Sequence, residues 1–109
     1  MELTYGRYLK VEELLQLQQP LSEGPEHDEM LFIIIHQVYE LWFKQILHEL
    51  EKLKSSFQEG ERGKALHTLK RIRSILKVLV SQVDVLETMT PLEFLSFRER
   101  LQSASGFQS

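Results

Sequence analysis

A phenylalanine and a histidine lie four residues apart in an apolar run, at Phe32 and His36. If the run is helical, side chains at positions i and i+4 share one face, so the ring and the imidazole point the same way. A histidine among apolar residues must find a hydrogen-bond partner or lose free energy. That partner is either a group of the core or a bound ligand, and the spacing alone favours the core.

An aromatic residue and an arginine repeat this spacing at Phe94 and Arg98. The guanidinium fork matches the geometry of a carboxylate, so this pair is a candidate clamp for an acidic group. The alternative is a surface arginine whose stem covers an apolar face, and the spacing alone favours that alternative. Near the N-terminus, Tyr5 and Tyr8 form either an aromatic lid or anchors in a core.

The other histidines, His27, His48 and His67, do not complete a recognisable metal site. The sequence has no Glu-x-x-His pair, so a carboxylate-bridged two-metal centre in a helical bundle is unsupported. It has no His-Glu-x-x-His zinc motif either. His48 and His67 stand among lysines and glutamates, and we expect both on the surface. No residue is therefore assigned as a metal ligand.

Charge and composition exclude several classes of protein. The 109 residues carry 13 Lys and Arg against 16 Asp and Glu, a formal net charge of −3, whereas nucleic-acid binding usually needs a clustered basic face. The chain has no cysteine, which excludes disulfides and thiolate sites and is compatible with a reducing compartment. No signal peptide is visible, and the longest apolar run, 30–35, is too short to span a bilayer. We expect a cytoplasmic protein without nucleic-acid or membrane partners.

Hydrophobic periodicity predicts an all-α fold in one region, 1–109. After a short N-terminal segment of about 1–26, with an amphipathic stretch at about 8–18, long helices are expected at about 28–58 and 63–87. The short turn between them makes these two helices antiparallel neighbours. A Thr-Pro-Leu-Glu start at residue 90 favours a fourth, short helix at about 91–101.

The two long helices carry the apolar stripes expected to form the core. The first stripe consists of Phe32, Ile35, Tyr39, Phe43, Ile46, Leu50, Leu53 and Phe57. The second consists of Leu66, Leu69, Ile72, Leu76, Leu79, Val83 and Leu86. The first helix has further apolar residues off its stripe, more than one partner helix can cover. This excess predicts a helical bundle that is oligomeric, or a protein with a further part.

Several segments resemble one enzyme family when taken together and in order. They are Thr4-Tyr5-Gly6-Arg7-Tyr8-Leu9, Gln19-Pro20-Leu21-Ser22, His27-Asp28-Glu29-Met30-Leu31-Phe32-Ile33-Ile34, His36-Gln37-Val38, Glu40-Leu41-Trp42, Val85-Leu86-Glu87-Thr88, Thr90-Pro91, Phe97-Arg98 and Ser105-Gly106-Phe107-Gln108-Ser109. Along essentially the whole chain their order and spacing are similar to the tryptophan 2,3-dioxygenase family. A set of this kind is far more specific than any single motif, and it reverses the preference for the core reading of His36 and the surface reading of Arg98.

The resemblance implies an all-helical, tetrameric haem enzyme that uses O2 to open the indole ring of L-tryptophan, giving N-formylkynurenine in the kynurenine pathway. It gives His36 the role of the distal histidine that hydrogen-bonds the indole N–H, and Phe32 that of a ring packed on the indole. Arg98 matches the arginine that binds the substrate carboxylate. Phe94 stands where some members have tyrosine, so a hydroxyl contact is missing.

The remaining matches concern the rim of the pocket and the neighbouring subunit. Tyr5, Tyr8 and Leu9 match residues that reach into the pocket of an adjacent subunit. Leu101, Ser105 and Gly106 match pocket-lining residues. Ser105 and Gly106 also match residues beside the cofactor.

The chain departs from the family in length, since family members are much longer. The resemblance places the axial histidine of haem, and a threonine that contacts the substrate amino group, beyond Ser109. The chain is therefore expected to supply the distal half of the site and to be inactive alone. The alternative is a non-catalytic helical oligomerisation fragment without haem. A weaker alternative, in which His48 or His67 ligates the iron, conflicts with their polar surroundings.

Overall fold

The structure is a computed structural model that describes residues 2–21 and 26–90. Four helices lie in these residues: α1 (Tyr5–Leu9), α2 (Val11–Leu14), α3 (Glu29–Gln58) and α4 (Arg62–Leu86). The described ranges contain no strand, which agrees with the expected all-α class. The helix expected at about 91–101 lies outside the described residues. Internal contacts divide the chain into two units, one containing the described residues up to Ile34 and the other residues 35–90.

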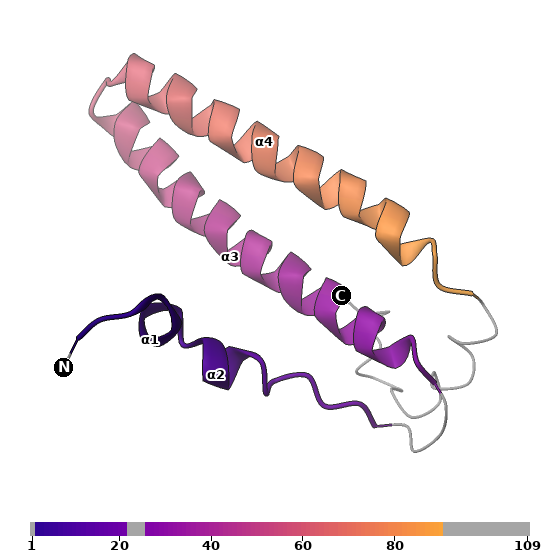
Figure 1. Ribbon diagram of the computed structural model, residues 1–109. Helices are drawn as coiled ribbons and strands as arrows, with labels where there is room; N and C mark the ends of the chain where they lie inside the picture. Colours follow the sequence, from indigo (N-terminus) through magenta and orange to yellow (C-terminus); the bar gives the residue numbers. More distant parts are fainter. Residues whose placement is uncertain (1, 22–25, 91–109) are drawn as a thin grey trace. The chain divides into compact units, whose positions relative to one another are not determined.

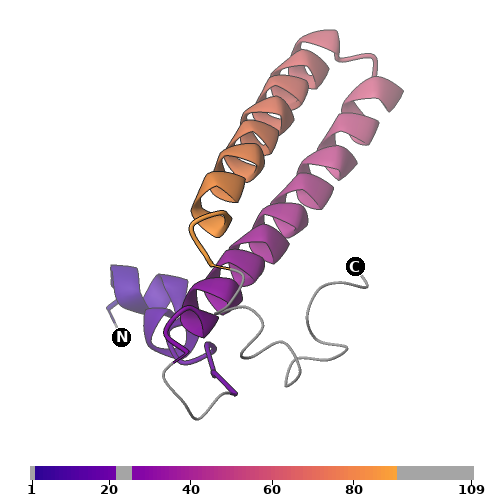
Figure 2. The same cartoon turned by 90° about the vertical axis from the view of Figure 1, so that its right-hand side faces the viewer.

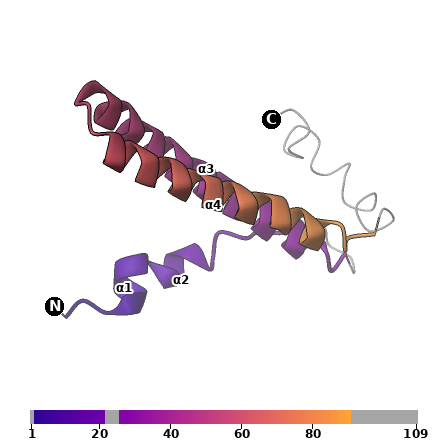
Figure 3. The ribbon, with the colours of Figure 1, turned by 90° about the horizontal axis from the view of Figure 1, so that it is seen from above.

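The N-terminal segment forms two short helices rather than the single amphipathic stretch expected at about 8–18. The Thr4 side chain caps α1 by accepting a hydrogen bond from the Arg7 N–H at 3.3 Å. Lys10 then takes left-handed backbone angles, φ 55° and ψ 46°, which end α1 before α2 begins (Figure 3). The sequence did not reveal this break, because neither a glycine nor a proline marks it.

A buried carboxylate holds the connector that precedes α3. Glu29, the first residue of α3, has only 1% of its surface exposed. One of its oxygens accepts a hydrogen bond from the Leu21 N–H at 2.8 Å. A carboxylate in the first turn also suits the positive end of the helix dipole. The start of α3 is therefore fixed by a side chain that binds backbone eight residues earlier.

In the second unit, residues 35–58 of α3 lie antiparallel to α4 (Figures 1 and 2). The Tyr39 hydroxyl donates a hydrogen bond to the Leu79 carbonyl oxygen at 2.8 Å. Further along the pair, Arg71 approaches Glu49 with 3.5 Å between Nη1 and Oε2. These two contacts confirm the predicted long antiparallel helix pair and set its register.

The seam between the two helices consists of the buried and half-buried residues that alternate at spacings of four and three. On α3 these residues are Ile35, Tyr39, Trp42, Ile46, Glu49, Leu53 and Ser56. On α4 they are Ala65, Thr68, Ile72, Ile75, Leu79, Gln82 and Leu86. The remaining residues of α4 are exposed. The seam is thus a mixture of apolar and polar side chains.

The predicted apolar stripes are only partly correct, because several of their members are exposed. On α3 the exposed members are Phe43, Leu50 and Phe57. On α4 they are Leu66, Leu69, Leu76 and Val83. Each of the seven follows a seam residue by one position, which turns it about 100° around the helix. The helices pair instead through smaller or polar residues at the preceding positions, among them Ser56, Ala65 and Thr68.

The turn between α3 and α4 depends on a glycine with a left-handed backbone. Gly60 has φ 71°, and its N–H donates a hydrogen bond to the Phe57 carbonyl oxygen at 3.2 Å. Just before α4, Glu61 forms an ion pair with Lys64. Hydrogen bonds from Glu59 first, and then from Lys64, hold the pKa of the Glu61 carboxyl below its ordinary value. The turn is therefore defined by backbone conformation and by surface charge.

Candidate functional site

The candidate site is built on the first turns of α3, which carry Phe32 and His36. The helix runs unbroken from Glu29, so the two residues lie one turn apart on the same face, as their spacing predicted. Phe32 is buried, with 8% of its surface exposed, whereas His36 is half-buried. A partly accessible imidazole beside a buried ring can meet a planar ligand and exchange a hydrogen bond with it.

The backbone of α3 fixes both side chains. The Phe32 N–H donates to the Asp28 carbonyl oxygen at 3.0 Å, which continues the helix from its first turn. His36 follows directly after the seam residue Ile35, which has 6% of its surface exposed. The position of the imidazole is therefore set by the packing of α3 on α4, one residue away from the seam.

The N-terminal candidates lie on α1, and all are exposed. The exposed fractions are 79% for Tyr5, 71% for Tyr8 and 45% for Leu9. These residues form no core within the described part of the chain, so the reading as core anchors is wrong there. Large exposed rings on a capped helix can contact another surface, which is a feature of protein interfaces.

Five further candidates, Phe94, Arg98, Leu101, Ser105 and Gly106, lie outside the described residues. Their predicted roles in binding the substrate carboxylate and lining the pocket stay predictions.

The histidines besides His36 do not extend the site. His27, His48 and His67 are exposed, as the sequence predicted for the last two. Within residues 2–21 and 26–90, no three histidine or acidic side chains come together in a way that could hold a metal ion. In the same ranges no helix is long and apolar enough to cross a membrane.

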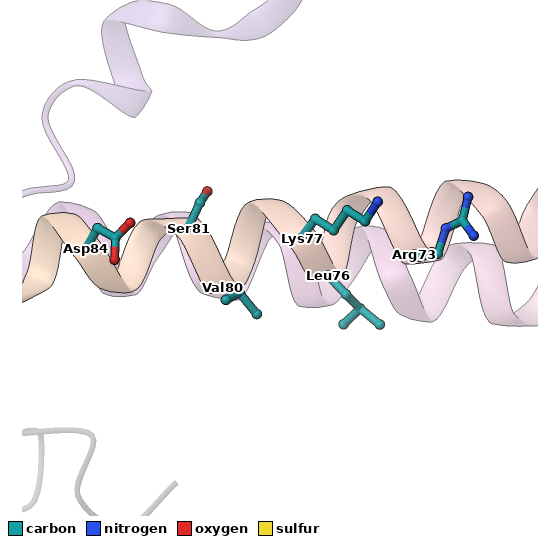
Figure 4. A pocket seen from close by; sticks show the side chains of 6 residues that line it. All are labelled: Arg73, Leu76, Lys77, Val80, Ser81 and Asp84. Carbon is teal, nitrogen blue, oxygen red and sulfur yellow. The ribbon is translucent and has the colours of Figure 1, made fainter.

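An open hollow on α4 does not form an alternative site. Its lining consists of Arg73, Leu76, Lys77, Val80, Ser81 and Asp84 (Figure 4). All six come from one helix, so no second element encloses a ligand there.

The spacing of apolar residues did not reveal a buried polar cluster around Glu49 in the seam. This side chain has 3% of its surface exposed, and its Oε2 accepts a hydrogen bond from Gln45 Nε2 at 2.7 Å. Arg71 Nη1 lies 3.5 Å from the same oxygen, while Glu49 Oε1 has no hydrogen-bond partner among the described residues. The alternation of fours and threes from Tyr39 through Ile46 would have placed Glu49 in the seam.

Comparison with known proteins gives a consistent set of matches. A family model described as tryptophan 2,3-dioxygenase matches residues 1–109. Three curated proteins named tryptophan 2,3-dioxygenase are similar to the chain. The one from Herpetosiphon aurantiacus is 64% identical over 107 residues, which are 98% of this chain and 41% of the relative. The one from Anaeromyxobacter sp. is 64% identical over 107 residues, covering 98% and 40%. The one from Aedes aegypti is 50% identical over 115 residues, covering 98% and 29%. The chain spans about two fifths or less of the length of these relatives.

Proposed function

The chain belongs to the tryptophan 2,3-dioxygenase family, and from that premise we propose that it supplies the substrate half of a haem-dependent site that inserts O2 into the indole ring of L-tryptophan. The product is N-formylkynurenine. The observation that carries the proposal is the pairing of buried Phe32 with half-buried His36 on one face of α3, in a chain that matches the family model throughout.

His36 is proposed to accept a hydrogen bond from the indole N–H. A neutral imidazole has one acceptor nitrogen, and an indole nitrogen is a donor only, so the two groups are complementary. A ring system without that N–H could not donate this hydrogen bond, which selects for the indole. Phe32 is proposed to pack against the indole ring and to hold its plane.

Arg98 is proposed to bind the substrate carboxylate through a charge-assisted, bidentate hydrogen bond. Phe94, four residues before Arg98, is proposed to offer an apolar surface in place of a hydroxyl group. Leu101, Ser105 and Gly106 are proposed to line the pocket, the last two beside the cofactor. Tyr5, Tyr8 and Leu9 are proposed to contact the pocket of a neighbouring subunit in a tetramer, and their exposure supports that role.

Apart from His36, which is proposed to meet the indole, the histidines that the structure describes do not fit the role of an axial haem ligand. His27, His48 and His67 are exposed, so none offers the enclosed imidazole that haem iron requires. When haem is bound it supplies the oxygen chemistry, and the protein supplies binding and orientation. We assign its axial ligand to the part of the family's length that this chain does not span.

The test uses a joined protein, in which this chain is followed by the part of the Herpetosiphon aurantiacus relative that lies beyond the match. His36→Ala in this protein is expected to lower kcat/KM for L-tryptophan by roughly tenfold or more, the cost of one lost hydrogen bond in a closed site. The matched control is His48→Ala, an exposed histidine on the same helix, which should leave kcat/KM unchanged.

A substrate analogue separates hydrogen bonding from packing. Tryptophan methylated on the indole nitrogen has no donor, so it should react poorly with the unsubstituted joined protein. The His36→Ala variant should discriminate less between tryptophan and this analogue. Equal discrimination by both proteins would remove His36 from its proposed role.

Arg98 has a separate prediction in the same protein. Arg98→Ala should raise KM by roughly tenfold or more, because a charge-assisted pair with the carboxylate is lost. Arg73→Ala, a change at an exposed arginine of α4, is the control and should leave KM unchanged. A KM that stays constant in Arg98→Ala would contradict the carboxylate clamp.

A non-catalytic helical oligomerisation fragment is the second candidate. The exposed apolar residues of α3 and α4, together with the lack of an enclosed histidine ligand in the described ranges, favour it. It predicts a stable helical oligomer of this chain, and a joined protein that binds neither haem nor tryptophan. Visible spectroscopy of the joined protein, with and without tryptophan, decides between the two functions.

A further inference from the structure

The register of α3 against α4 can be read from two contacts. Tyr39 bonds to Leu79, and Glu49 approaches Arg71. In an antiparallel pair the residue numbers at one level have a constant sum, and these contacts give 118 and 120. Residues whose numbers add up to about 119 therefore lie level with each other.

Five apolar residues outside the seam fall on the same side of this pair. Each directly follows a seam residue that stands four positions before the next seam residue, and they are Phe43, Leu50, Leu69, Leu76 and Val83. In an antiparallel pair, positions that follow corresponding seam residues on the two helices flank the same side of the seam. We call these five residues the apolar face.

The polar cluster verifies this assignment of sides. Gln45 and Arg71 each precede a seam residue by one position, and so belong to the opposite side of the seam. Both reach the same carboxylate oxygen of Glu49, as residues on one shared side must. The two sides of the helix pair therefore differ: one carries Gln45 and Arg71 together with Val38, Val78 and Val85, and the other carries the apolar face.

The apolar face is exposed and carries no charge. Its five side chains are each 40–49% exposed, although all are large and hydrophobic. By the register, Leu50 lies level with Leu69, and Phe43 lies level with Leu76. Figure 4 shows Leu76 projecting to one side of α4 together with Val80. An uncharged apolar strip of this kind is a mark of a surface that another element covers.

The apolar face leads directly to the proposed site. His36 follows the seam residue Ile35 by one position, as Leu50 follows Glu49, so it continues the same row on α3. By the register it lies level with Val83. An element that packs along the whole apolar face and continues this row therefore reaches the imidazole.

We propose that the apolar face is the docking surface for the part of the family's length that this chain does not span, a helix-forming polypeptide whose packing closes the pocket at His36. The inference deepens the proposed function and rests on it. The 107 matched residues are only 41% of the Herpetosiphon aurantiacus relative, so the larger part of that protein is available as the occupant.

A second copy of the chain is a poorer occupant of the same surface. Two identical faces related by a two-fold axis would overlap along their whole length. Such a pair would cover His36 as well as the five apolar residues, because His36 lies in the same row. A different polypeptide can cover the five apolar residues and stop before His36.

The test places a single reporter on the apolar face. The chain has no cysteine, so Leu50→Cys gives one labelling position for an environment-sensitive fluorophore. The matched control is Leu41→Cys, nine residues earlier and therefore two and a half turns around α3, on the opposite side. Leu41 is also exposed, at 55%. The titrant is the separate polypeptide of the Herpetosiphon aurantiacus relative beyond the match.

Docking on the apolar face predicts a saturable blue shift of the Leu50 label and no shift of the Leu41 label. Leu50→Glu should raise the Kd for the titrant by roughly tenfold or more, because a charge would be buried without a partner. Leu41→Glu should change the Kd less than twofold. Circular dichroism of both variants verifies that the helices remain formed.

A second measurement covers the case in which the separate polypeptide does not fold. In the joined protein, with any other cysteine replaced by serine, Leu50→Cys should react with a thiol reagent at least tenfold more slowly than in this chain alone. Leu41→Cys should show the same rate in both. Equal reactivity of Leu50→Cys in both proteins, or protection of Leu41→Cys instead, overturns the docking surface.

These readouts need neither haem nor tryptophan, so they are separate from the test of function. Docking in an inactive joined protein would keep this inference and end the proposed function. Activity of the joined protein without protection of the Leu50→Cys thiol would support the proposed function and overturn this inference. A label shift that depends only on the concentration of this chain would identify a second copy as the occupant and would overturn the proposal.

Discussion

At the scale of single residues, the environment of each side chain separates groups that look alike in the sequence. Four histidines are present, and His36 alone is half-buried among residues that the structure describes, with the other three exposed. Of the three tyrosines, Tyr39 is half-buried and bonded across the helix pair. Tyr5 and Tyr8 are exposed. Residue type and spacing identify these side chains as candidates, and burial then distinguishes among them.

The tyrosine hydroxyl that joins α3 to α4 should contribute measurably to stability. Tyr39→Phe removes the hydrogen bond to the Leu79 carbonyl oxygen and is expected to lower the free energy of unfolding by about 1 kcal/mol. Tyr8→Phe, at a position with 71% of its surface exposed, is the control and should have no effect. Urea unfolding followed by circular dichroism measures both. An equal loss in the two variants would mean that the Tyr39 bond adds nothing.

Unlike the Tyr39 hydroxyl, the buried carboxylate in the seam is not expected to stabilise the fold. Glu49 has one oxygen without a partner in the described part of the chain, and burial of such a group is costly. The Arg71 side chain is 49% exposed, so water can solvate its charge when the carboxylate is removed. Glu49→Leu should therefore leave the free energy of unfolding unchanged or raise it by about 1–4 kcal/mol. Glu51→Leu, at an exposed position of the same helix, should stay within about 0.5 kcal/mol. A clear loss of stability in Glu49→Leu would show that the cluster stabilises the pair.

At the scale of elements, the sequence predicted the two long helices but not the side on which they meet. Apolar periodicity favoured Leu50 and Leu69, yet the structure buries their predecessors Glu49 and Thr68. Periodicity detects every face that is kept from water, including one covered by another part of a protein. It cannot separate that face from the seam of the pair, because both repeat every three or four residues.

The two glycines around the turn offer a direct test of backbone conformation. Gly60 has φ 71°, so Gly60→Ala should lower the free energy of unfolding by about 1–2 kcal/mol. Gly63 lies in the first turn of α4, without a positive φ, and an added Cβ meets nothing within 4 Å. Gly63→Ala should raise stability by about 0.4–1 kcal/mol. Thermal unfolding of both variants measures the difference, and changes of the same sign would contradict this account of the turn.

At the scale of the whole molecule, the family, the helical class and the long pair could all be predicted from ordered motifs and periodicity. The roles of Arg98 and Ser105 rest on resemblance alone, since they lie outside the described residues. The break at Lys10 could not be predicted, because a lysine with left-handed backbone angles carries no compositional signal. The occupant of the apolar face could not be predicted either, because a sequence shows which residues are apolar and not what covers them.

The apolar face also has a thermodynamic prediction. In this chain alone, Leu50→Ser should change the free energy of unfolding by no more than about 0.5 kcal/mol, because the side chain is already exposed. In the joined protein the same change should cost about 2–5 kcal/mol, the loss expected for a buried leucine. Denaturant unfolding of both proteins tests this contrast. A small change in the free energy of unfolding in both proteins would mean that Leu50 is exposed to water in both.

The alternation of fours and threes along the seam has a consequence for handedness. Seven residues per two turns is a period of 3.5, slightly shorter than the 3.6 of a straight helix. Two helices that keep such a seam in contact wind around each other as a left-handed supercoil. The row from Leu50 to His36 belongs to the same seven-residue repeat, so it follows the supercoil and not a straight line. A helix that covers this row must therefore repeat its own apolar residues every 3.5 residues, a heptad pattern that can be sought in the sequence of any proposed partner.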